Sequence, residues 1–396
     1  MHRVRILVVG LVCAFALGAQ ISQDEYRARR EAARKSLSDA VLVLFGPEGE
    51  APVDPEFYYL TGWTEPGAIL MLTAHRDVLF LPAHNAALEK YTGRREAATD
   101  EDARRATGFE EVLPVAQFEA RFAEALEGGS RVYTRAAEKL KPLAPLRQFP
   151  TSAQVLDPLR AVKSQAEIAL IAHSAGVTVE AHRAAWRRIA AGVYEYQVAA
   201  TMTFAMLDRG CEGNAYDPIV GSGPNGTVLH YSKNSRRMEA GELVLMDVGA
   251  KCDAYAADVT RTVPVSGRFT PRERELYDIV LGAYKAALAA VKPGATLAQL
   301  TQTARDYFKA HGGLDKYLTH RITHGVGLEV HDHPDAFSAA PLQAGMVITI
   351  EPGLYIPEER VGIRIEDTVL VTEDGARVLS AALPKEAAEI ERAMAR

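Results

Sequence analysis

The stretch from Leu243 to Arg261 constrains this chain more than any other. It reads LVLMDVGAKCDAYAADVTR and places Asp247 and Asp258 in two apolar, alternating segments that are typical of half-buried strands. The polar break at 251–253 suits a hairpin turn, which would put the two aspartates opposite each other on one face. Two carboxylates this close repel each other unless a positive charge lies between them. The pair alone leaves two interpretations open: a bound cation, or one acid at a helix terminus and one exposed acid.

Further acids that follow strand-like runs in the C-terminal half favour the cation. Glu351 follows the buried-looking run VITI, and an acid there is costly unless it is ionised against a partner. In GIRIEDTVLV, alternation places Arg364 and Glu366 on one face of a strand. His324 and His331 lie seven residues apart in THGVGLEVHD. Acids and a histidine from separate strands can converge on one site.

This ordered set of ligands resembles that of the pita-bread metallopeptidases, which include methionine aminopeptidase, prolidase and aminopeptidase P. The set is Asp247, Asp258, His324, Glu351 and Glu366. Each member lies inside a matching local motif, and the resemblance covers nearly the whole chain after residue 22. It implies an α/β (α+β) protein whose catalytic domain has a strongly curved, mostly antiparallel sheet backed by helices.

We expect three parts in the chain. Residues 1–20 begin with the basic segment MHRVR and continue with an apolar run too short for a membrane span, which is typical of a cleaved secretory signal peptide; an uncleaved membrane anchor is the alternative. Residues 22–158 would form a small α/β domain that resembles the N-terminal domain of aminopeptidase P. Residues 159–396 would form the catalytic domain. Apolar runs in the first domain predict strands at 40–45, 68–73 and 78–83.

The resemblance implies a role for each ligand. A site of carboxylates and imidazole suits two divalent ions, and we expect Mn²⁺, with Co²⁺, Zn²⁺ and Fe²⁺ as alternatives. By the family pattern Asp258 and Glu366 would bridge the ions and Asp247 would bind one of them. His324 and Glu351 would bind the other ion, and Glu351 would also carry the proton of the attacking water.

Five residues are expected on the substrate side by the same resemblance. His331 would stabilise the developing oxyanion, and His230 would contact the substrate backbone near the scissile bond. His320 and Tyr355 would also line the substrate, with a structural role as the alternative for each. Arg364 would orient a ligand acid or bind substrate.

The histidine-rich loop departs from the family pattern. The family often has H-G-x-G/S-H, whereas this chain has HRITH at 320–324. Gly325 follows, where some aminopeptidase P enzymes carry a tryptophan. Both changes leave the ligand His324 in place but alter the walls of the substrate site. They therefore weaken the choice between aminopeptidase P and prolidase.

One motif suggests a different class of protein. GSGPNG at 221–226 satisfies the G-x-G-x-x-G pattern of dinucleotide-binding proteins and follows a strand-like run. That pattern requires a helix immediately after the loop, whereas TVLHY at 227–231 is β-branched and aromatic, as in a strand. We therefore reject nucleotide binding. The same segment resembles the surroundings of the active-site histidine in aminopeptidase P and prolidase.

We expect an exported metallo-exopeptidase that removes the first residue from peptides with proline second. Xaa-Pro dipeptidase is the alternative, and a non-catalytic pita-bread peptide-binding module is a distant one, because such modules typically lack the ligands kept here. A creatinase-type hydrolase lacks them too. The resemblance also implies a homo-oligomer, either a dimer or a tetramer.

The amino-acid composition limits the kinds of partner that the chain can bind. The net charge of −6 and the lack of a basic run argue against nucleic acid, and we expect no stable membrane span after signal cleavage. Cys211 and Cys252 would remain in the mature chain. Two cysteines leave open whether they form a disulfide or stay reduced in the core.

Overall fold

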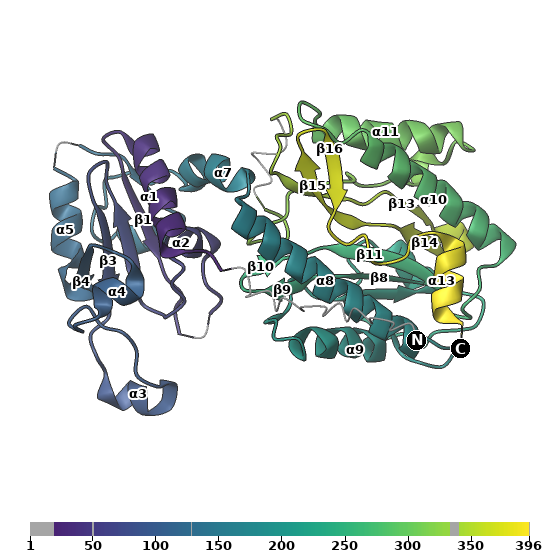
Figure 1. Ribbon diagram of the computed structural model, residues 1–396, viewed down its shortest axis with the longest axis horizontal. Coiled ribbons are helices and arrows are strands. Elements are labelled where there is room, and N and C mark those ends of the chain that lie inside the picture. The colour runs from purple at the N-terminus through teal and green to yellow at the C-terminus, as the bar shows by residue number, and fades with distance from the viewer. Residues whose placement is uncertain (1–19, 50, 128, 333–339, 396) are drawn as a thin grey trace, which may run out of the picture.

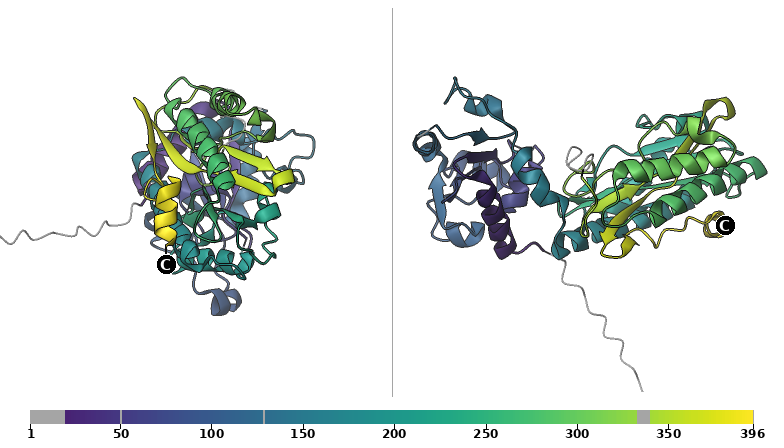
Figure 2. Two further views of the ribbon diagram at one scale, coloured as in Figure 1. Left: turned by 90° about the vertical axis from the view of Figure 1, so that its right-hand side faces the viewer. Right: turned by 90° about the horizontal axis from the view of Figure 1, so that it is seen from above.

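Two lobes joined by a helical linker make up the chain (Figure 1), and they lie end to end along its long axis (Figure 2). The computed structural model describes residues 20–49, 51–127, 129–332 and 340–395. The signal peptide predicted for residues 1–20 therefore lies outside the described residues, except for Gln20. In the described part of the chain, no helix is both long enough and apolar enough to cross a membrane.

The sheet of the N-terminal lobe has five strands in the order β4-β3-β2-β1-β5. The central strands pair antiparallel, whereas each edge strand runs parallel to its neighbour. The strands are β1 (Val41–Phe45), β2 (Ile69–Leu72), β3 (Asp77–Leu81), β4 (Glu111–Pro114) and β5 (Val132–Tyr133). The first three are those that the apolar runs predict, so this prediction is confirmed.

Helices cover both faces of this sheet because its strands are apolar on both sides. Leu42 and Leu70 pack in one cluster with side chains of α1 and α2, whereas the alternate residues Val43 and Phe80 pack in another with Phe118 of α5. The helices are α1 (Gln23–Leu37), α2 (Pro55–Thr61), α3 (Ala86–Thr92), α4 (Ala103–Thr107), η1 (Val115–Gln117), α5 (Phe118–Ala125) and α6 (Ala137–Leu140). The lobe is thus a small layered α/β unit, as predicted.

Antiparallel pairing holds for every described sheet of the C-terminal lobe. The strand orders are β11-β8-β7, β10-β9-β6, β12-β15-β16 and β13-β14. The strands are β6 (Gly213–Asn214), β7 (Ile219–Ser222), β8 (Leu243–Val248), β9 (Ala250–Cys252), β10 (Tyr255–Ala256), β11 (Val259–Pro264), β12 (Val347–Ile350), β13 (Gly353–Ile356), β14 (Val361–Arg364), β15 (Asp367–Thr372) and β16 (Gly375–Val378). The mostly antiparallel catalytic domain is confirmed.

Long helices flank these sheets. The helices are α7 (Ala153–Ala161), α8 (Gln165–Arg188), α9 (Glu195–Leu207), α10 (Pro271–Ala289), α11 (Leu297–Ala310), η3 (Leu314–Tyr317), η4 (Pro357–Glu359) and α13 (Ala387–Met394). Capping boxes at Ser164, Thr270 and Thr296 begin α8, α10 and α11. α8 packs against α9 and against β9 to β11, while α10 packs against α11 and against β12 to β14. The predicted domain boundary at 158–159 falls within the linker helix α7.

Strands β8 and β11 are buried along their whole length, whereas the sequence predicts half-buried strands. Every residue of both strands is buried. Both α8 and β14 pack against this pair, so little of either strand meets solvent. The acids on these strands therefore lie in an interior where an unpaired charge is costly.

The segment TVLHY at 227–231 is not a strand, which corrects the sequence prediction. A short 3₁₀ helix, η2 (Gly223–Thr227), is followed by bends and turns. The backbone of η2 lies directly against β14, because a Cβ atom on Gly362 would lie 1.8 Å from the carbonyl oxygen of Gly226. The lack of a side chain at Gly362 thus permits close backbone packing between β14 and η2. The α-helix that a dinucleotide-binding loop requires does not follow η2.

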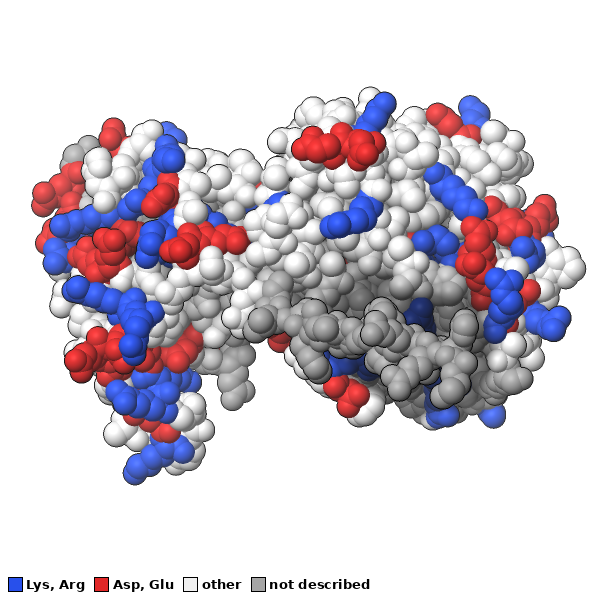
Figure 3. Space-filling view, in the orientation of Figure 1, with Lys and Arg blue, Asp and Glu red and all other residues white. Residues whose placement is uncertain are grey.

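Charged side chains of both signs are mixed on the face shown in Figure 3. Lys and Arg lie among Asp and Glu over the described parts of both lobes on this face. Exposed charges also pair within helices, such as Arg27 with Asp24 in α1 and Arg274 with Asp278 in α10. Exposed pairs of this kind contribute little to stability, so this surface is best described as a solvated one.

Candidate metal centre

A cavity of about 700 Å³ in the C-terminal lobe brings together the residues that the sequence singles out. Its lining includes the five predicted metal ligands Asp247, Asp258, His324, Glu351 and Glu366. It also includes the predicted substrate-side residues His230, His320, His331 and Arg364. Tyr355 is buried just behind this lining and contacts two of its members, His320 and Arg364.

Asp247 and Asp258 reach the cavity from one long hairpin. The turn falls at Asp253 and Ala254, both at positive φ, rather than at the predicted break at 251–253. The register therefore pairs Asp247 with Thr260, so Asp258 lies diagonally from it instead of directly opposite. Because residues two apart on a strand share a face, both aspartates lie on the same face.

Backbone hydrogen bonds hold the remaining ligands beside this hairpin. The loop that carries His324 runs along β12: the amide of Thr349 donates to the carbonyl of His324 at 2.9 Å, and Oγ1 of Thr349 accepts from the amide of His324 at 3.1 Å. Glu351 directly follows β12 and therefore lies beside His324. The amide of Glu366 donates to the carbonyl of Thr260 at 3.1 Å, which joins the connection between β14 and β15 to β11.

The predicted ligands lie close enough to share metal ions. Ligand atoms of Asp258, His324 and Glu366 all lie within 4.8 Å of one another. Nε2 of His324 lies 3.5 Å from Oδ2 of Asp258 and 3.5 Å from Oε1 of Glu351. Donor atoms about 2.0–2.2 Å from one tetrahedral ion are about 3.5 Å apart, so the spacing fits a divalent cation. The oxygen-rich donor set fits the same group of ions.

Raised pKa values of acids in the centre also indicate that this site suits a cation. Burial, followed by the repulsion of Asp258, raises the pKa of Glu366 well above its usual range. Burial likewise raises the pKa of Asp258, and that of Glu351 to about 7. For His324, burial lowers the pKa. The hydrogen bond to Asp258 and the negative charge of Glu351 outweigh this effect of burial, so the pKa of His324 is raised to about 9. A divalent cation would replace these protons, because carboxylates and neutral imidazole are the forms that bind metal.

Arg364 is the buried cation of the centre. Its Nη2 donates to Oδ2 of Asp247, and its Nη1 donates to the hydroxyl of Tyr355 at 2.8 Å. Its Nε donates to Oγ1 of Thr260 at 3.1 Å, and that hydroxyl donates to Oε2 of Glu366 at 2.6 Å. Arg364 therefore contacts Asp247 directly and Glu366 only through Thr260. One guanidinium cannot neutralise four carboxylates.

Three further histidines, His230, His320 and His331, line the cavity. The hydroxyl of Tyr355 lies 3.0 Å from Nε2 of His320, and Nδ1 of His320 lies 2.7 Å from the carbonyl of the next residue. The ring of His331 lies edge-on to that of His324, with centroids 4.4 Å apart. Burial lowers the pKa of His320 and of His331 to about 4, so both are neutral near pH 7 and can each donate one N–H. His230 is exposed at the cavity.

Two residues of the centre escape the sequence analysis. The hydroxyl of Tyr216 donates to Oδ1 of Asp247 at 2.5 Å and also contacts Oδ1 of Asp258. Burial and these acids raise the pKa of Tyr216 well above its usual range, so it keeps its proton. Thr260 links Arg364 to the ligands as described. It lies two residues after Asp258 on the same strand face, and this period-two relation is the signal that could have found it. Nothing comparable marks Tyr216.

Comparison with known proteins agrees with this geometry. The model of "Metallopeptidase family M24" matches residues 169–373, and that of "Aminopeptidase P, N-terminal domain" matches residues 26–133. The Xaa-Pro aminopeptidase of Escherichia coli (strain K12) is 32% identical over 435 residues, which cover 95% of this chain and 98% of the relative. The Xaa-Pro dipeptidase of Pyrococcus horikoshii is 34% identical over 357 residues, which cover 87% of this chain and 93% of the relative.

Solved structures agree as well. The Zn-substituted aminopeptidase P of E. coli in complex with product superposes with a TM-score of 0.84 at 30% sequence identity. The match covers 95% of this chain and 98% of that structure. Both lobes of the present chain are therefore included in the likeness. Similar sequences carry two activities by name, aminopeptidase and dipeptidase, so the comparison alone does not choose between them.

Proposed function

The chain belongs to metallopeptidase family M24, and from this premise we propose that it cleaves the N-terminal Xaa-Pro bond of peptides. It is a metallo-exopeptidase. The products of the proposed reaction are the first amino acid and a shortened peptide that begins with proline. The alternative within the family is an Xaa-Pro dipeptidase, which is confined to two-residue substrates.

The observation that carries the proposal is the convergence of acids in one cavity with too little positive charge. Asp258 and Glu366 are 5% and 1% exposed, and Asp247 is 8% exposed. The described lining contains two arginines and no lysine, and of these Arg364 is the buried one. Its guanidinium is already paired with Asp247. A folded protein does not keep such a cluster ionised without further cations. Bound divalent ions meet this requirement.

We propose two Mn²⁺ ions in this centre. The family implies divalent metal ions, and a donor set of oxygen and imidazole nitrogen favours Mn²⁺ over thiolate-seeking metals. The ions would be held by Asp247, Asp258, His324, Glu351 and Glu366, with Asp258 and Glu366 shared between them. When bound, such ions supply Lewis acidity, which lets a water molecule lose its proton near neutral pH.

The remaining steps fall to side chains of this chain. Glu351, whose pKa is raised by burial, is placed to take up a proton and pass it to the leaving nitrogen. His331 is neutral and can donate an N–H to the substrate carbonyl as negative charge develops on its oxygen. The Arg364–Tyr355–His320 chain of hydrogen bonds fixes His320 at the substrate wall, while the exposed His230 contacts the substrate backbone.

The cations of the cavity favour an aminopeptidase over a dipeptidase. A dipeptidase has to bind the free carboxylate of proline, and a fixed cation suits that task best. Among the described lining residues, only Arg321 and Arg364 are Arg or Lys. Arg364 already donates to Asp247, Tyr355 and Thr260, and Arg321 is exposed. Neither is a buried, unpaired cation poised for the proline carboxylate, so a longer peptide should be accommodated.

Substrate length tests this choice. With Mn²⁺ present, an Xaa-Pro-Yaa tripeptide should be cleaved with a higher kcat/KM than the Xaa-Pro dipeptide, because the described lining offers no buried, unpaired Arg or Lys for the proline carboxylate. The tripeptide amide should be cleaved as well as the free acid, and alanine in place of proline should be cleaved poorly. Arg321→Gln should leave this order unchanged. Efficient cleavage of the dipeptide alone, lost in Arg321→Gln, would reassign the chain to the dipeptidases.

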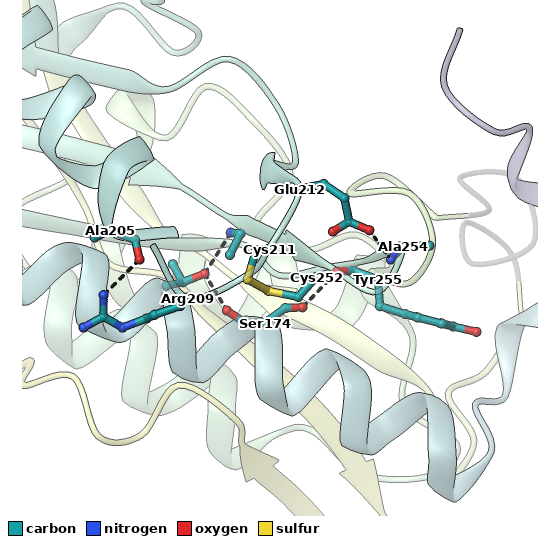
Figure 4. Close-up of a disulfide and its surroundings, with 10 residues drawn as sticks. Ser174, Ala205, Arg209, Cys211, Glu212, Cys252, Ala254 and Tyr255 are labelled. Carbon is teal, nitrogen blue, oxygen red and sulfur yellow. Dashed lines mark hydrogen bonds between the residues drawn. A yellow bond between two sulfur atoms is a disulfide. The ribbon is translucent and has the colours of Figure 1, made fainter. Parts of the chain in front are cut away.

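We also propose that the protein is exported. The basic and apolar start of the chain supports this, and so does a disulfide between Cys211 and Cys252 (Figure 4), since disulfides persist mainly in oxidising compartments. Intact mass spectrometry of protein from its own host should show a chain that lacks roughly the first 19 residues and two thiol hydrogens. A chain that begins at Met1 and carries two free thiols would contradict the proposal.

A further inference from the structure

A buried ionic cluster lies where the linker between the lobes meets the loop that carries His331. Nη2 of Arg160, near the end of α7, donates to Oδ1 of Asp332 at 2.6 Å. Nζ of Lys163, which follows α7, donates to Oδ2 of the same carboxylate at 2.9 Å. None of these three residues is more than 4% exposed. Both oxygens of Asp332 are therefore fixed by cations that belong to the linker.

Asp332 also closes the loop that follows His324 and contains His331. Its amide donates to the carbonyl of Gly325 at 2.9 Å, so residues 325–332 form a closed loop next to the ligand His324. A Cβ atom on Gly327 would lie 2.3 Å from Oδ2 of Asp332, which leaves room only for glycine at that position. With its base closed and Asp332 anchored, the loop holds the ring of His331 against that of His324.

The cluster is not built for stability alone. Arg160 leaves Nε and Nη1 without a hydrogen-bond acceptor among the described residues, although the residue is fully buried. Its Nη2 also contacts Oε2 of Glu329 at 3.1 Å. Buried ion pairs pay a large desolvation cost and seldom outperform apolar packing, whereas they fix geometry well. Position is therefore the property that this cluster supplies.

We infer that Arg160 and Lys163 are positioning residues for the reaction, and that they act through Asp332 on His331. The inference rests on the proposed peptidase function, in which His331 donates to the substrate carbonyl. Misplacement of such a donor by about 1 Å can cost about 10²-fold in rate. The cluster also continues into the N-terminal lobe, because Glu329 lies 3.8 Å from Arg135, which pairs with Glu56 of α2 at 2.8 Å. The position of His331 thereby depends on both lobes.

Lys163→Met tests the inference with the least damage to the fold, because Asp332 keeps its contact with Arg160. We expect kcat for an Xaa-Pro peptide to fall about 10- to 100-fold with little change in KM. In a His331→Ala background the same substitution should have almost no further effect, since the residue through which it acts is gone. Lys163→Arg, which keeps the charge, should recover much of the rate.

Arg30→Met is the matched control. Arg30 is an equally buried cation of the N-terminal lobe, and its Nε lies 2.7 Å from Oδ2 of Asp77, far along the chain from the cavity. This variant should unfold at a lower temperature and keep the wild-type kcat. If Lys163→Met and Arg30→Met lose stability alike and neither loses kcat, the cluster is merely structural.

Hydrogen exchange gives a readout that does not depend on activity. Lys163→Met should speed exchange of the amides in 325–332 while leaving β8 and β12 unchanged, and Asp332→Asn should do so more strongly. Unchanged exchange in this loop, or an equal loss of kcat in the wild-type and His331→Ala backgrounds, would overturn the inference. If the wild-type protein with Mn²⁺ cleaves no Xaa-Pro peptide, the proposed function fails, and the exchange experiment still decides whether the cluster holds the loop.

Discussion

Exhaustive chelation should abolish the peptidase activity of this chain, and added Mn²⁺ should restore it. The activated water depends on the Lewis acidity of bound cations, and no side chain of the described lining can replace them. Arg364, the buried cation present, is committed to Asp247, Tyr355 and Thr260. Without metal, Glu366 and Asp258 bind protons readily, because burial raises the pKa of both; repulsion by Asp258 adds to this for Glu366, and repulsion by Asp247 adds to it for Asp258. Activity and metal content are measured on the same samples.

Metal binding should also stabilise the fold. A measurement of stability therefore distinguishes a protein that has lost its metal from one that has unfolded. An ion that binds only the native state stabilises it by about 2.7 kcal/mol at a hundred times its dissociation constant. The Tm should therefore rise as Mn²⁺ is added to the chelated protein. Asp247→Asn with Asp258→Asn should lose this rise. Full activity in a sample that elemental analysis shows to be free of metal would refute the proposed mechanism.

The candidate site could be predicted from the sequence to the extent that the ligand acids follow visible apolar runs. Glu351 comes directly after VITI, and this run is the strand β12. Glu366 follows GIRI and falls between β14 and β15. An acid at the end of a buried strand needs a charged or hydrogen-bonding partner. Several such acids along the chain therefore suggest a common site. The same reasoning identified the strands β1 to β3 of the first lobe.

What escaped prediction depends on contacts between distant segments. Tyr216 lies in YDPIV, where an aromatic residue is equally typical of a core position, and its contacts with Asp247 and Asp258 arise only when β7 pairs with β8. The hairpin turn lies later than the sequence predicts, because Asp253 and Ala254 both adopt positive φ and alanine is not a residue that marks such a turn. For 227–231, close packing of η2 on β14 overrides the strand preference of the local residues.

Glu351→Gln should lower kcat by about 10²–10⁴-fold at saturating Mn²⁺, because a glutamine cannot carry the proton. The amide preserves the shape of the side chain, and Glu351 lies at the edge of the centre, 3.5 Å from Nε2 of His324. Most of the fold should therefore survive, and substrate affinity should change less than the rate. Circular dichroism and metal analysis establish that the variant is folded and loaded before kcat and KM are compared.

The control for this substitution is Glu358→Gln in η4, which is an exposed glutamate outside the cavity lining. It changes the net charge by the same amount and should leave kcat unchanged. Because Glu351 serves both as ligand and as proton carrier, the loss in Glu351→Gln should persist when Mn²⁺ is raised further; recovery to the wild-type rate would mean that only metal affinity had changed. A fully loaded Glu351→Gln protein with the wild-type kcat would show that another group moves the proton.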